Sequence, residues 1–162
     1  MAKRKKDAWN PSKSAAENAK LVLPALAAAY FEEGRRITAK PLPHAKLHPF
    51  RLRTKRFRYT LELFRPCYGR GLEQRLEALR RIQQYLGEIS DCAATRSLLG
   101  PAASVRTRSG APLSRFLNRR AMARATEFRR YWTRSFDAFG RERWWTGYLA
   151  RFAGRVSKAK RK

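Results

Sequence analysis

The chain has 162 residues, which is enough for one domain with a substantial core. Apolar residues make up 43% of it, and this content excludes a chain that is disordered throughout. There are 38 Lys and Arg against 12 Asp and Glu, so the formal net charge is +26. Such a charge predicts a polyanionic partner, such as nucleic acid, an inorganic phosphate polymer or anionic lipid.

The first helix is expected to begin after a capping serine, Ser12 or Ser14, and to run to about Glu33. Gly34 then follows as a residue of the C′ type, which ends a helix. Pro24 lies inside this helix and is expected to kink it or to mark a restart.

The next elements alternate between helices and breaker-rich segments. Residues 35–46 contain two prolines and are expected to form a loop. A second helix is expected over 48–65, with proline in its first turn and another proline just beyond its end. A turn over 67–71 leads to a third helix over 72–98, although Gly87 within it argues against an unbroken helix.

Residues 100–112, GPAASVRTRSGAP, form the clearest expected loop. A fourth helix is expected over 113–139, and a further short helix follows Gly140. Arg120 and Arg124 fall on a line of the fourth helix that otherwise faces the core. This position suggests that the fourth helix also contributes to a ligand groove.

No strand-period alternation and no hairpin signal occurs in the sequence. We therefore predict an all-α fold, an antiparallel four-helix bundle with long helices and flexible basic termini. The expected domain covers 12–155, with a disordered basic arm over 1–11 and a basic tail over 156–162.

One stripe of the second helix predicts the binding site. His48, Arg51, Lys55 and Arg58 fall at i, i+3, i+7 and i+10, so they lie on one side of a helix. Apolar residues flank this stripe on both edges: Phe50, Phe57, Leu61 and Phe64 on one, and Leu52, Tyr59 and Leu63 on the other. A stripe between two apolar edges is expected to face a groove between packed helices.

Three or more cations in a partly closed groove repel one another and lose hydration unless an anion is present. The sequence therefore predicts a polyanionic ligand. The alternative is that these charges are simply solvated, as some must be in so basic a chain. Glu62 lies four residues after Arg58 and is expected to hold it as an ion-pair partner. His48 is either a locally satisfied residue at the helix start or a donor to phosphate beside free backbone N–H groups.

Two stretches resemble the CHAD (conserved histidine α-helical) domain family. HPFRLRTKRFRYTLELF is similar to the helix that names the family, in which basic residues follow a His at three, seven, eight and ten positions. LEALRRIQQYLGEISD is similar to the family's next helix. The resemblance implies an all-helical domain with a basic concave face that binds inorganic polyphosphate. It assigns the ligand positions to His48, Arg51, Lys55, Arg56, Arg58 and Arg80.

The chain departs from that family in one respect. Family members carry two four-helix bundles, whereas the His-led motif occurs once here, so the chain resembles a half-length version and most resembles the second half. Our hypothesis is that two chains pair as a homodimer to replace the duplicated domain.

Other chemistries have weaker support in the sequence. His44 and His48 have the spacing of a zinc pair, but prolines bracket them and no acidic third ligand is nearby. No acidic cluster, P-loop or nucleophile paired with a base is recognisable, so we predict no metal, no cofactor and no catalysis. Trp144 and Trp145 either close the end of the bundle, which we favour, or stack on bases.

The predicted function is polyphosphate binding. The alternatives are general binding of RNA or DNA and, less favoured, an enzyme that acts on phosphate polymers.

Cys67 and Cys92 are too few for a disulfide framework, and Leu21 to Phe31 is about half of a membrane span. No export signal is recognisable. We therefore expect a cytoplasmic protein without membrane contact, associated with polyphosphate granules.

Overall fold

The structure is a computed structural model that describes residues 9–100 and 110–154. These residues form helices and connections without any strand, which confirms the predicted all-α fold. In chain order the elements are α1 (Ala15–Thr38), η1 (His44–Leu47), α2 (His48–Leu63), α3 (Arg65–Tyr68), α4 (Gly71–Leu99), α5 (Gly110–Tyr131), the π-helical η3 (Trp132–Phe136) and α6 (Arg141–Arg151).

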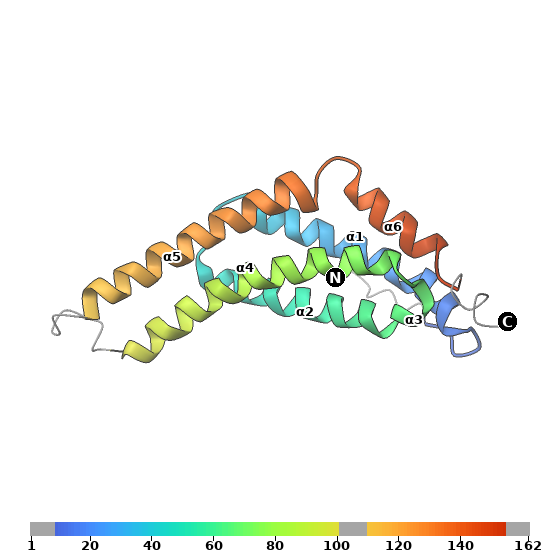
Figure 1. Cartoon of the computed structure of the whole chain (residues 1–162), viewed down its shortest axis with the longest axis horizontal. Helices are drawn as coiled ribbons and strands as arrows, with labels where there is room; N and C mark the ends of the chain where they lie inside the picture. The colour runs from blue at the N-terminus through green and yellow to red at the C-terminus, as the bar shows by residue number, and fades with distance from the viewer. Residues whose placement is uncertain (1–8, 101–109, 155–162) are drawn as a thin grey trace, which may run out of the picture.

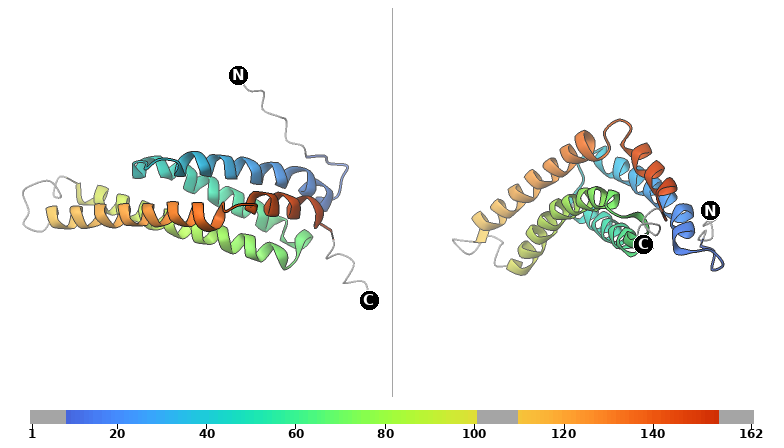
Figure 2. Two further views of the ribbon diagram at one scale, coloured as in Figure 1. Left: turned by 90° about the horizontal axis from the view of Figure 1, so that it is seen from above. Right: turned by 45° about the vertical axis from the view of Figure 1, so that its right-hand side comes forward.

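The helices form an antiparallel four-helix bundle, as predicted (Figures 1 and 2). α2 packs against α1 and α4, and α4 packs along α5. The fourth rod of the bundle is bent, because α5 and η3 end before Gly140 and α6 turns to run along α1. The far end of the α4–α5 hairpin projects beyond α1 and α2 (Figure 1).

α1 begins as the sequence indicates but ends later. Ser14 accepts from the Glu17 N–H and the Glu17 carboxylate accepts from the Ser14 N–H, which is a capping box. The helix continues through Pro24 and past Gly34, so the predicted end before Gly34 is wrong. Gly34 is needed for packing instead, because a Cβ there would lie 1.9 Å from the Trp132 indole.

Three further boundaries and one expected helix interruption differ from expectation. The expected loop over 35–46 contains the end of α1 and most of η1, and the expected turn over 67–71 overlaps the one-turn helix α3. α4 is unbroken at Gly87, where an added Cβ would meet nothing within 4 Å. α5 begins at Gly110, inside the expected loop over 100–112.

Aromatic residues fill the core where α1, α2 and the bent fourth rod meet. Trp132 and Phe136 lie one turn apart in η3 with ring centroids separated by 4.7 Å, and Phe31 stacks on Phe136. Trp145 is fully buried in the same cluster, which confirms its expected core position, whereas Trp144 is partly exposed.

The N-terminal segment is held against the bundle from Trp9 onward. The Asn10 N–H donates to Asn18 Oδ1 at 2.7 Å, and the Trp9 ring lies 6.3 Å from that of Phe64. The rest of the expected arm, residues 1–8, and the tail over 156–162 lie outside the described residues.

Candidate functional site

The cationic stripe lies on α2, on the side that turns toward α4. His48 is exposed at the start of the helix, and Arg51, Lys55 and Arg58 are half-buried. On one edge of the stripe, Phe50, Phe57 and Leu61 enter the core as expected. The opposite edge, Leu52, Tyr59 and Leu63, is exposed, so among the described residues only one edge of the stripe is packed.

A pocket with a volume of about 430 Å³ lies at the His48 end of the stripe. We call it the His48 pocket; it is lined by Leu47, His48, Leu86, Ile89, Ser90, Ala93, Ala94 and Ser97. The α4 residues at its surface are mostly small, so α2 and α4 leave a hollow beside His48. This pocket was not predicted from the sequence, although serine and alanine recur along α4 at helical spacing.

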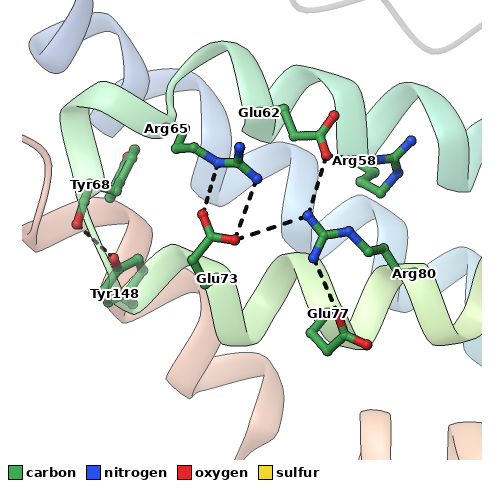
Figure 3. A network of polar contacts seen from close by, with 8 residues as sticks. All are labelled: Arg58, Glu62, Arg65, Tyr68, Glu73, Glu77, Arg80 and Tyr148. Carbon is green, nitrogen blue, oxygen red and sulfur yellow. Dashed lines mark hydrogen bonds and ion pairs between the residues drawn. The ribbon is translucent and has the colours of Figure 1, made fainter.

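The other end of the α2–α4 junction is closed by an ion-pair network (Figure 3). Arg58 pairs with Glu62, and Glu62 also reaches Arg80 on α4 at 3.8 Å. Arg80 contacts two further carboxylates, Glu77 at 3.1 Å and Glu73 at 4.0 Å. This network neutralises both arginines, and it confirms the expected pairing of Arg58 with Glu62.

Arg51 and Lys55 lie between these two ends. α2 and α4 are antiparallel, since His48 meets Ser90 and Ala94 while Glu62 meets Arg80. Arg51 and Lys55 follow His48 on the same side of α2 by one and two turns. Neither has a carboxylate partner among the described residues, so within that part of the chain their charges are uncompensated.

The remaining predicted residues lie elsewhere. Arg56 is exposed on the side of α2 that faces α1. Arg124 of α5 pairs with Glu88 of α4 at 2.6 Å and with Glu127, and these contacts raise its pKa, chiefly through the hydrogen bond to Glu127. Arg120 is exposed one turn before Arg124.

α4 lies between α2 and α5, so the predicted residues do not line one groove (Figure 1). Arg120 and Arg124 are on the α5 side of α4, and the stripe is on the α2 side. The structure therefore brings together His48, Arg51 and Lys55 at one end, followed by the braced pair Arg58 and Arg80.

One buried arginine, Arg75, was not anticipated from the sequence. Arg75 is 2% exposed, donates to the carbonyl oxygens of Gly71 and Trp144, and lies 3.4 Å from the Trp144 ring centre. Tyr148 covers it at 3.7 Å. Burial lowers the pKa of Arg75 to about 10, so the side chain stays charged at neutral pH while it fastens α6 to α4.

The described residues contain no group of three His, Cys, Asp or Glu side chains that could hold a metal ion. The His44 side chain, half of the zinc pair considered from the sequence, is outside what the structure describes. No helix within residues 9–100 and 110–154 is long and apolar enough to cross a membrane.

Comparison with known families shows that the CHAD domain matches residues 2–100, which is more than half of the chain. The chain belongs to the CHAD domain family. No curated protein and no solved structure matches it. The CHAD match includes α2, α4 and the whole junction between them and ends at Gly100, so Arg120 and Arg124 lie beyond it.

Proposed function

We propose that this CHAD-family chain binds inorganic polyphosphate, without catalysis, at the open end of the α2–α4 junction. The observation that carries the proposal is the row formed by His48, Arg51 and Lys55. These side chains share one side of α2, end at the His48 pocket and have no carboxylate partner within the described residues. The family's association with polyphosphate binding supports this choice of anion.

The chemistry of the row suits a linear phosphate polymer. Such a polymer presents closely spaced negative charges without bases or sugars, so repeated cations at helical pitch can recognise it. Arg51 supplies a planar fork for two phosphate oxygens, and Lys55 supplies a compact charge. No side chain caps the start of α2, and the positive end of its dipole adds to the field beside His48.

We assign the other predicted residues supporting roles. Arg58 and Arg80 hold α2 against α4 through Glu62, so they position the row rather than contact the first bound phosphates. Arg56, Arg120 and Arg124 add to the long-range attraction of a polyanion. We place the protein in the cytoplasm, associated with polyphosphate granules.

RNA or DNA binding is the alternative that the +26 charge favours. Competition at about 0.15 M salt, near physiological ionic strength, separates the two. The proposal predicts that short RNA fails to displace labelled polyphosphate at equal phosphate concentration. Displacement of polyphosphate by RNA under these conditions contradicts it.

Catalysis is tested separately. The full chain is incubated with polyphosphate and Mg²⁺ or Mn²⁺, and released phosphate is measured. We expect no release above that of a buffer control. Release that depends on the protein and is lost with Arg51→Gln contradicts a purely binding role.

A further inference from the structure

α1 contains an uncharged stretch in a chain that is otherwise crowded with charge. From Leu21 to Phe31 there is no Asp, Glu, Lys or Arg. Leu23, Ala27, Tyr30 and Phe31 form its inner face and are almost completely buried. Its outer face is also apolar, and there Leu21 remains 44% and Leu26 41% exposed. A helix that is apolar on all sides is normally covered on all sides.

The exposed apolar surface continues onto α2. Leu52, Tyr59 and Leu63 are 40%, 50% and 79% exposed, on the side of the helix opposite its core-facing residues. α1 and α2 are joined at this level by the hydrogen bond between the Tyr30 and Thr54 hydroxyl groups. Among the described residues, five of the thirteen large hydrophobic side chains left exposed belong to these two helices.

A groove with a volume of about 540 Å³ runs between α1 and α2 on this surface. Leu26, Ala29, Pro49 and Leu52 are among its lining residues. We call the groove together with Tyr59 and Leu63 the α1–α2 face. Alanines on the outer side of α1 allow another helix to approach closely.

The rim of the α1–α2 face carries charges of both signs. Glu32 follows the apolar run, is exposed and has no ion-pair partner in the described chain. Arg56 on the α2 side also lacks a carboxylate partner there, whereas Arg53 is held by Glu33. A partner with an acidic helix would be complementary to a purely basic rim. A rim with both signs is instead complementary to itself under two-fold symmetry.

We propose that a second copy of this chain covers the α1–α2 face in a symmetric homodimer. The two apolar faces pack together, and the unpaired Glu32 of each chain lies near the basic rim of the other. The pairing does not depend on the proposed function. It does explain why Leu52, Tyr59 and Leu63, which border His48 and Lys55 on α2, are left exposed by the described part of a single chain.

The salt dependence of this dimer is opposite in sign to that of polyanion binding. Two chains of charge +26 repel one another, so added salt screens the repulsion and favours an apolar interface. Salt weakens polyphosphate binding, because counterion release contributes less to it. A bound polyanion also neutralises the chains, so it should favour the dimer; this last step rests on the proposed function.

Sedimentation velocity of the full chain tests the inference, at about 0.15 M and about 0.5 M salt. We expect a monomer–dimer equilibrium that shifts at least threefold toward dimer at the higher salt. Leu26→Gln with Leu63→Gln should leave a monomer under both conditions. Leu98→Gln with Phe116→Gln removes two exposed apolar side chains from the α4–α5 hairpin and should leave the dimer intact.

Circular dichroism checks that both double variants keep the parental helix content. A parental chain that stays monomeric at all concentrations in high salt overturns the proposal, as does loss of the dimer only in the Leu98 and Phe116 variant. A salt-strengthened dimer without specific polyphosphate binding would refute the proposed function and leave this interface standing.

Discussion

The two ends of the α2–α4 junction use the same kinds of residue for different purposes. At one end Arg58 and Arg80 are surrounded by Glu62, Glu73 and Glu77, so their charges are already satisfied. At the other end His48 lines a pocket, and Arg51 and Lys55, the next cations along α2, have no carboxylate partner in the described chain. Cations on one sequence stripe are therefore not equivalent: the closed end braces the helices, and the open end remains available to an anion.

The strongest single disruption is a carboxylate in the His48 pocket. Ser90→Glu places a negative charge beside the row, and two unit charges about 8 Å apart at an effective dielectric constant of about 20 repel by about 2 kcal/mol. Polyphosphate affinity should therefore fall about thirtyfold. Titration calorimetry measures the change. The control is Thr95→Glu, the same charge change at an exposed position of α4, and equal losses in both variants would contradict the pocket's role.

Removing Glu62 from the ion-pair network should raise polyphosphate affinity, in contrast to the decrease expected for Ser90→Glu. Glu62→Gln releases Arg58 and Arg80, which should raise polyphosphate affinity about threefold to tenfold and cost about 0.5–1 kcal/mol of unfolding free energy. Binding titration and urea unfolding measure the two effects. Glu142→Gln removes a carboxylate from the Arg35 pair on α1 and α6 and should leave affinity unchanged. A fall in affinity for Glu62→Gln would show that the network forms part of the binding site.

His48 begins the row. Its imidazole N–H can donate to a phosphate oxygen, so His48→Ala should lower polyphosphate affinity by up to about fivefold, as expected for one exposed hydrogen bond. Titration calorimetry of parent and variant measures the change. An unchanged affinity would exclude a direct role for His48.

Gly87→Ala has the smallest expected effect, and it should change the unfolding free energy without changing polyphosphate affinity. An added Cβ meets nothing within 4 Å, so Gly87→Ala should raise the unfolding free energy by about 0.5–1 kcal/mol. Polyphosphate affinity should not change. Urea unfolding gives the stability, and a decrease would mean that the open space beside Gly87 is needed by the folded chain.

The sequence predicted the helices well where periodicity alone decides them, as in α2 and α4. It failed where distant packing decides. Gly34 is a residue type that commonly ends a helix, yet α1 continues past it. The missing side chain at Gly34 leaves space for Trp132, which lies almost a hundred residues later in the sequence. No local pattern around residue 34 carries that information.

The candidate site, like the fold, could be predicted from the sequence only in part. The stripe from His48 to Arg58 follows from helical spacing. Which of its cations stay uncompensated depends on α4, whose Arg80, Glu73 and Glu77 join Glu62 only after the chain folds. The spacing predicts that the second apolar edge of the stripe lines a groove, but Leu52 and Leu63 are exposed, because no element of the described chain packs on that side.

One comparison tests the central claim most directly: the polyphosphate affinities and unfolding midpoints of two double variants with equal loss of charge. Arg51→Gln with Lys55→Gln should lose at least about hundredfold in affinity, because each charged contact contributes about 1.5–3 kcal/mol, and should keep the parental midpoint. Arg58→Gln with Arg80→Gln should lose no more than about threefold in affinity and should unfold at lower urea. Equal affinity losses in the two variants would contradict the account and assign binding to the overall +26 charge.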